Sequence, residues 1–379
     1  MDMNNIKKQL FTLDAFTFES GKTIPITLGY ETYGQLNEDR SNVILVNHYF
    51  SASSHAAGKY SPEDVTAGYW DSLIGPGKAV DTNQYYVISI DNVANVQAKN
   101  ENVITTGPRT INPKTGKRYG VDFPPFTFRD MAKIQREFLS KQLGIDQLYA
   151  VMGASAGGFI SLYWAILYPE AVNRVIGVIT NPQNPVQTSF HVCQHAMRAI
   201  ELDPLWNNGH YEDGKEPLAG LQLAVQMMNT GAFTYEFFEE TYKRDSFEDS
   251  PYQQIKEMTN YEKQLYKAIQ ASSSLVDASH WYYTSRATML HDLAYGYSSL
   301  QEALKRIKAD VLMISCTDDQ LQPTQYNRDM VDILREQGKQ ADLVEFQSKY
   351  GHMSGILETH LFSHSINQFL TSKSMSESL

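Results

Sequence analysis

The sequence is poor in cysteine and in positive charge. Among its 379 residues are only two cysteines, Cys193 and Cys316, which lie far apart and form no CxxC motif. This spacing excludes a disulfide framework and a cysteine-based metal motif, and it fits the reducing cytoplasm. The net charge of -11 argues against nucleic acid as the main partner, because binding to phosphates needs a basic face.

Long apolar runs are missing as well. Residues 1–13 mix polar and apolar side chains and lack the continuous apolar segment of a secretory signal. No apolar stretch approaches the roughly 20 residues of a membrane-spanning helix. The HExxH spacing of a zinc-dependent hydrolase does not occur either. We therefore expect a cytoplasmic protein that has no membrane contact and no catalytic metal.

Short apolar runs alternate with helical patterns in the first part of the chain and again near its end. Such runs fit strands that are buried on both faces of a parallel sheet, and their alternation with helices predicts an α/β fold. The predicted strands are residues 43–47, 85–90, 148–152, 174–180, 310–315 and 341–346, and the predicted helices are residues 128–139, 159–167, 324–337 and 355–370.

A middle stretch has a different character. Residues 181–300 are rich in Gln, Tyr, Met and Glu, and helical periodicity dominates there, for example in 218–228 and 252–271. We interpret this stretch as an inserted helical cap, or lid. The core domain then comprises residues 1–180 and 301–379.

The segment Gly153-Ala154-Ser155-Ala156-Gly157 matches the motif G-x-S-x-G. It stands between a predicted strand and a predicted helix, which is the context of a nucleophile elbow. Glycine at both ends leaves room for a tight turn, and the turn would present the Ser155 hydroxyl at a helix N-terminus, where negative charge is favoured. A phosphate-binding turn is the alternative, but Phe159-Ile160 stand where a P-loop has Lys followed by Ser or Thr. A dehalogenase would need a carboxylate in place of Ser155.

A serine nucleophile needs a base, and the base needs a carboxylate partner. The loop after the predicted strand 310–315 offers two carboxylates, and we favour Asp319 over Asp318 because it lies four residues before Pro323. A surface turn without catalytic function is the other interpretation of this loop. His352 follows the strand 341–346 and is the candidate base, since its loop opens at the carboxyl edge of the sheet.

The order Ser, Asp, His is typical of the α/β-hydrolase fold, which has a mostly parallel central sheet flanked by helices. The tetrahedral intermediate of acyl transfer needs two N–H donors. One should come from Ala156, which follows the nucleophile. The other should come from the loop 47–58 after the first predicted strand, and Phe50 N–H is our candidate.

Several segments, in the same order along nearly the whole chain, resemble the homoserine O-acetyltransferase family. They are His48, His55, Ala57 and Gly58; Trp70-Asp71; Leu73-Ile74-Gly75-Pro76-Gly77-Lys78-Ala79; Thr106-Gly107-Pro108; Ile111-Asn112-Pro113; Thr115-Gly116-Lys117; Tyr119-Gly120; Arg129-Asp130-Met131; Asp203-Pro204 with Trp206; Asp277-Ala278; Arg286-Ala287; Asp319-x-Leu321-x-Pro323; and Tyr350-Gly351-His352. The resemblance implies a ping-pong reaction in which acetyl-CoA, a co-substrate rather than a bound cofactor, acylates Ser155 and a hydroxyl compound accepts the acyl group. It also implies a homodimer formed through the cap and a place in methionine biosynthesis.

The chain departs from this family where the acceptor should bind. The family holds the homoserine carboxylate with an arginine on a cap helix, where this sequence has Met197, with Arg198 one position on. The family also has an aspartate directly after the catalytic histidine, where Met353 stands here. Losing two charge-assisted hydrogen bonds should weaken homoserine binding roughly a hundredfold to ten-thousandfold. An esterase with the same triad is therefore the alternative function, and a binding protein that has kept only the fold is a further one.

Overall fold

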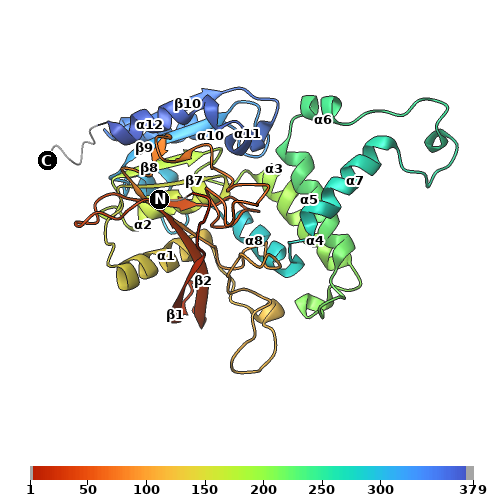
Figure 1. Cartoon of the computed structure of the whole chain (residues 1–379), viewed down its shortest axis with the longest axis horizontal. Coiled ribbons are helices and arrows are strands. Elements are labelled where there is room, and N and C mark those ends of the chain that lie inside the picture. Colours follow the sequence, from red (N-terminus) through yellow and green to blue (C-terminus); the bar gives the residue numbers. More distant parts are fainter. Residues whose placement is uncertain (1–2, 373–379) are drawn as a thin grey trace.

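A sheet of eight strands forms the centre of the computed structural model, which describes residues 3–372 (Figure 1). Its order is β1-β2-β6-β3-β7-β8-β9-β10. β2 pairs antiparallel with β1 and with β6, and all other pairs are parallel. The strands are β1 (Gln9–Thr17), β2 (Thr23–Tyr33), β3 (Val43–Asn47), β6 (Tyr86–Ile90), β7 (Ala150–Ala154), β8 (Arg174–Val178), β9 (Asp310–Cys316) and β10 (Ala341–Phe346), while β4 (Ile74–Gly75) and β5 (Val80–Asp81) pair separately.

Helices cover both faces of this sheet. The α-helices of the described residues are α1 (Phe128–Leu143), α2 (Ala156–Leu167), α3 (Val186–Thr188), α4 (His195–Leu202), α5 (Leu218–Ala232), α6 (Tyr235–Thr241), α7 (Asn260–Ser273), α8 (Ala278–Met289), α9 (Leu300–Leu304), α10 (Gln325–Glu336), α11 (Ser354–Leu357) and α12 (Ser363–Thr371), and not all of them lie on the sheet. No helix of the described residues is long and apolar enough to cross a membrane.

The alternation of side chains along β3 explains why its sequence is apolar throughout. Val43 and Leu45 join the apolar cluster that α1 and α2 cover, whereas Ile44 and Val46 join the cluster under α12. Successive side chains of a strand point to opposite faces, so a strand covered on both faces needs apolar residues at every position. The α/β-hydrolase fold predicted from the sequence is confirmed.

Several predicted boundaries differ from the structure. The predicted strand 148–152 starts and ends two residues later as β7, so that it runs directly into Ser155. The predicted helix 252–271 begins only at Asn260, where Thr259 and Glu262 form a capping box. The single helix expected at 355–370 is wrong: the chain breaks it around Phe362, whose buried ring packs against Phe346 of β10.

The segment between β8 and β9 contains α3 to α9. Figure 1 shows α4, α5, α6 and α7 grouped to one side of the sheet. α8 is different, because its Trp281 is buried and contacts the ring of Phe50 in the loop after β3, with 4.8 Å between the ring centroids. The division into a core and a cap of residues 181–300 stays a prediction. Helix α8 lies within the predicted cap but also contacts the predicted core.

The turn from β7 to α2 is the tightest connection near the sheet edge. A Cβ atom added to Gly157 would lie 2.0 Å from the carbonyl oxygen of Asn47 at the end of β3. A Cβ added to Gly153 would lie 2.3 Å from the backbone of Gly157. The two glycines of the motif are therefore required by close backbone contacts, as the sequence predicts.

We predict that Gly157→Ala lowers the free energy of unfolding by about 3 kcal/mol, because backbone rather than a movable side chain blocks the added methyl group. Gly116→Ala is the control without a steric block: Gly116 has open space around it, although, unlike Gly157, it has a positive φ of 68°. It should lose only about 1 kcal/mol. Urea unfolding of the three proteins measures both values, and equal losses for the two variants would contradict the steric account.

Candidate active site

Ser155 stands at the N-cap of α2 with φ 51° and ψ -120°. This is a conformation that residues other than glycine rarely adopt, so it has to be held by its surroundings. Four hydrogen bonds do so: Ser155 N–H donates to the Val178 carbonyl (2.9 Å), and the Ser155 carbonyl accepts from Thr180 Oγ1 (2.9 Å), Gly158 N–H (2.8 Å) and Phe159 N–H (3.2 Å). The strained backbone of the nucleophile elbow is thus fixed by β8 and by the first turn of α2.

The Ser155 hydroxyl is part of a continuous chain of hydrogen bonds. His352 Nε2 lies 2.8 Å from Ser155 Oγ, and His352 Nδ1 lies 2.7 Å from Asp319 Oδ2. Because the carboxylate of Asp319 accepts, Nδ1 carries a proton and Nε2 is free to receive the proton of the serine. The structure therefore brings the three residues predicted from the sequence into the geometry of a catalytic triad.

Asp319 is held in place by backbone groups of its own loop. Its Oδ1 accepts hydrogen bonds from the N–H groups of Leu321 (2.8 Å) and Gln322 (2.9 Å), and its side chain is fully buried. With Oδ1 occupied, Oδ2 is left to face His352. The orientation of the histidine ring thus depends on the turn that follows β9.

The second carboxylate of this loop has another partner. Asp318 Oδ2 accepts a hydrogen bond from Ser348 N–H (3.0 Å), in the loop that leads from β10 to His352. It makes no contact with the histidine ring. The two neighbouring aspartates therefore have different roles. Asp319 contacts the base His352, and Asp318 holds the loop that carries this histidine.

The two predicted oxyanion donors both lack a hydrogen-bond acceptor among the described residues. Neither Phe50 N–H nor Ala156 N–H donates a hydrogen bond to any group within residues 3–372. The loop with Phe50 starts against the elbow, since a Cβ added to Gly157 would lie 2.0 Å from the carbonyl oxygen of Asn47 and 2.8 Å from that of His48. Unpaired N–H groups on buried residues are rare, and two of them beside a nucleophile are suited to bind a developing oxyanion.

A cavity of 340 Å³ lies beside this site. Met353, which follows the histidine, and Ser51, which follows Phe50, both line it, as does Trp281 of α8. The other lining residues are Gln97, Val225, Met228, Asn229, Ala232, Phe233, Ser272, Leu275 and Val276. None of these side chains carries a charge, so the cavity suits an uncharged group.

The two other predicted substrate contacts lie elsewhere. Met197 is buried within the helices around α4 and does not line the cavity. Arg198 is exposed and pairs with Glu201, one turn further along the same helix, at 2.5 Å. One step along a helix turns a side chain by about 100°, which is why the neighbouring arginine does not replace the one expected at position 197. Met197 and Arg198 therefore stay candidates for substrate contact, and neither lines this cavity.

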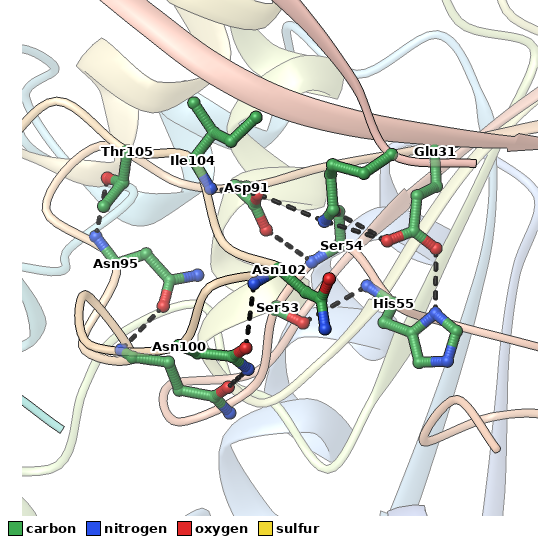
Figure 2. Close-up of polar contacts among 12 residues, drawn as sticks. Glu31, Ser53, Ser54, His55, Asp91, Asn95, Asn100, Asn102, Ile104 and Thr105 are labelled. Atoms are coloured by element: carbon green, nitrogen blue, oxygen red, sulfur yellow. Dashed lines mark hydrogen bonds and ion pairs between the residues drawn. The ribbon is translucent and has the colours of Figure 1, made fainter. Parts of the chain in front are cut away.

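Sequence reasoning missed a buried polar network next to the loop 47–58, which carries Phe50 and is called the oxyanion loop below (Figure 2). Glu31 of β2 accepts hydrogen bonds from Tyr33, His55 and Tyr60 and pairs with Lys8 at 2.8 Å. Burial alone would raise the pKa of Glu31, but the His55 hydrogen bond and the Lys8 charge outweigh it and lower this pKa to about 2. A carboxylate that falls on the buried side of an alternating strand is the signal that could have revealed this network.

No cluster of three or more His, Cys, Asp or Glu that could hold a metal ion occurs among residues 3–372.

Comparison with known proteins identifies the family and its fold. Residues 37–359 match the family model of the α/β hydrolase fold. The homoserine O-acetyltransferase of Deferribacter desulfuricans is 37% identical over 363 residues, which cover 94% of this chain and 93% of that protein. The solved structure of homoserine O-acetyltransferase from Bacillus anthracis is 55% identical, with a TM-score of 0.96 over 98% of this chain and 99% of that one. The structure of esterase E22 is 39% identical, with a TM-score of 0.92 over 96% of this chain and 100% of that one.

These relatives and the observed geometry agree on one class of enzyme, in which acyltransferases and hydrolases share a fold. The chain belongs to the homoserine O-acetyltransferase family of the α/β-hydrolase fold.

Proposed function

We propose that this enzyme takes an acetyl group from acetyl-CoA onto Ser155 and passes it to the hydroxyl group of a small acceptor. The observation that carries the proposal is the chain of hydrogen bonds from Ser155 through His352 to Asp319, next to two open N–H donors. Such an arrangement activates a hydroxyl group and stabilises the oxyanion that forms when it attacks a carbonyl carbon.

The first half of the reaction acylates the serine. His352 Nε2 takes the proton of Ser155 as its Oγ attacks the thioester carbonyl, and the carbonyl oxygen becomes an oxyanion facing the N–H groups of Phe50 and Ala156. The C–S bond then breaks, and the protonated histidine gives its proton to the leaving thiolate. Asp319 stabilises the imidazolium form in between.

The second half uses the same groups in reverse order. His352 takes the proton of the acceptor hydroxyl, whose oxygen attacks the acyl carbon. The second oxyanion occupies the same two N–H donors, and its collapse returns the proton from the histidine to Ser155 Oγ. The enzyme therefore accepts those compounds that fit beside the acyl-serine and place a hydroxyl group near His352 Nε2.

The lining of the cavity favours an uncharged acceptor. Homoserine carries both an ammonium and a carboxylate group, and a buried charge without a partner costs several kcal/mol. Met353 presents a thioether where the family resemblance implies a carboxylate, and the described cavity lining includes no arginine. We infer that the preferred acceptor is a neutral hydroxyl compound.

Hydrolysis is the second candidate function. It needs no acceptor site at all, because water can attack the same acyl-serine. The uncharged cavity supports it, since no group there would hold a charged acceptor in place of water. The likeness to esterase E22 supports it as well.

The proposal includes a homodimer formed through the cap helices. Its support is the exposure of large apolar side chains on and between α4 and α7, among them Leu202, Tyr235, Phe247 and Ile255. Large apolar side chains that gather on one surface of a domain are typical of contact surfaces. Light scattering of the purified enzyme would give its mass in solution.

We predict that Ser155→Ala abolishes the burst of p-nitrophenol that accompanies acylation by p-nitrophenyl acetate. The burst depends on Ser155 Oγ, and no other nucleophile contacts His352 Nε2 in the described chain. Stopped-flow absorbance measures the burst, and thermal unfolding verifies that the variant is folded. A full burst from the folded variant would refute the assignment of the nucleophile.

The two aspartates offer a matched pair of variants. Asp319→Asn should lower kcat by about 10⁴-fold, because an amide next to Nδ1 favours the wrong tautomer of the histidine. Asp318→Asn keeps an oxygen that can accept from Ser348 N–H, so it should lower kcat less than about tenfold. Steady-state hydrolysis of p-nitrophenyl acetate distinguishes them, and the reverse order of effects would exchange the roles of the two residues.

Release of free thiol from acetyl-CoA distinguishes transfer from hydrolysis. We expect that homoserine leaves the rate of thiol release unchanged, because the cavity has no charged partner for it, whereas a small neutral alcohol raises the rate. A Met353→Asp variant, which adds the carboxylate implied by the family resemblance, should respond more to homoserine than the wild type does. Strong acceleration of the wild type by homoserine would contradict the proposed acceptor class, and no thiol release under any condition would exclude acetyl-CoA as the donor.

A further inference from the structure

The inference concerns the peptide unit between Tyr49 and Phe50, whose N–H is one of the two oxyanion donors, and it rests on the proposed function. The carbonyl oxygen of Tyr49 accepts two hydrogen bonds. One comes from His48 Nδ1 at 2.8 Å, and the other comes from Ala52 N–H at 3.1 Å. A carbonyl oxygen can only accept, so Nδ1 of His48 must carry the proton.

The other ring nitrogen of His48 fixes the same tautomer independently. Nε2 accepts a hydrogen bond from Asn92 N–H at 3.1 Å, and a backbone N–H can only donate. Asn95 Nδ2 also lies 3.1 Å from Nε2, and it donates to the Ala52 carbonyl at 3.0 Å. The ring is therefore neutral, with both nitrogens satisfied, and burial of the ring lowers the pKa of His48.

A planar trans peptide transmits this anchoring to the N–H group on its other side. No peptide bond in the described chain is cis, so the C=O of Tyr49 and the N–H of Phe50 point in opposite directions. Holding the carbonyl toward His48 thus turns the N–H away from it. This N–H is the donor that finds no partner within residues 3–372.

The rest of the loop is anchored by other groups. Figure 2 shows the contacts of Asp91 with Ser54 and of Glu31 with His55. Asp91 Oδ1 accepts from Ser54 N–H at 2.7 Å, and Glu31 Oε2 accepts from His55 Nδ1 at 2.9 Å. These contacts start at Ser54, five residues after Tyr49. His48 is the side chain that holds the donor peptide itself.

We propose that His48 is a positioning residue that locks the Tyr49–Phe50 peptide with its N–H directed at the oxyanion. A rotated peptide would present the Tyr49 carbonyl instead, which repels a negative oxygen. The hydrogen bond from His48 also polarises the peptide and makes the N–H a stronger donor. A donor that is already oriented needs no rearrangement when charge develops in the transition state.

The test compares two substitutions at this position. His48→Ala removes the anchor, and kcat for p-nitrophenyl acetate should fall about 10- to 100-fold, somewhat less than the loss of a whole oxyanion donor, with little change in KM. His48→Asn places an amide N–H near the position of Nδ1, so it should recover most of this loss. His55→Asn is the matched control, because it changes a histidine of the same loop that contacts Glu31 and not the donor peptide; it should change kcat less than about threefold.

A transition-state analogue separates positioning from a general loss of structure. A small alkylboronic acid forms a tetrahedral anionic adduct with Ser155, so its inhibition constant should rise in parallel with the fall of kcat across the His48 variants. A folded His48→Ala enzyme with wild-type kcat would overturn the inference. So would a lower kcat with unchanged boronate affinity.

If His48→Ala does not fold, Asn95→Ala replaces it, because this change removes only one of the partners of Nε2. It should lower kcat and boronate affinity together by about threefold to tenfold, and no change in either would contradict the inference. Failure of the proposed function looks different. In that case the wild-type enzyme itself would show no turnover that depends on Ser155.

Discussion

The contact between Gly157 and the Asn47 carbonyl is the constraint on which the rest of the site depends. It presses the first turn of α2 against the end of β3, closer than any side chain would allow. The chain can make this turn only if Ser155 takes a left-handed conformation, with φ 51°. The serine hydroxyl is thereby exposed above the sheet edge, and the loop after β3 has to pass directly beside it. Nucleophile and oxyanion donors are thus brought together by one backbone contact.

The surrounding groups divide into those that act on the reacting atoms and those that hold them. Asp319 contacts His352, while its neighbour Asp318 holds the loop that carries the histidine. On the opposite side, buried charges on Glu31, Lys8 and Asp91 hold the oxyanion loop. The 340 Å³ cavity, in contrast, has no charged side chain in its lining. Charged side chains therefore fix the loops around the triad, whereas uncharged side chains, polar as well as apolar, line the cavity.

Much of this could be predicted from the sequence, because the relevant signals are local. The glycines around Ser155 mark a tight turn and the apolar runs mark buried strands, and each pattern can be recognised within a few neighbouring residues, even where the contact that requires it is distant in sequence. The sequence alone distinguishes Asp319 from Asp318 poorly, since both stand in one loop and their roles differ only by the direction in which each carboxylate points. The break in the helix predicted at 355–370 could not be seen, because it results from packing of Phe362 on a strand distant in sequence. In the sequence His48 is only one residue of a motif, since its role depends on which peptide its ring contacts.

The central claim is that Ser155 becomes acylated, and peptide mapping of the trapped intermediate tests it most directly. The enzyme is mixed with p-nitrophenyl acetate, quenched in acid within the burst, digested, and analysed by tandem mass spectrometry. Our account predicts one acetyl group on the peptide that contains the β7–α2 turn, located on Ser155 and absent from the Ser155→Ala enzyme. An acetyl group on another side chain, or its persistence in the Ser155→Ala enzyme, would contradict the account.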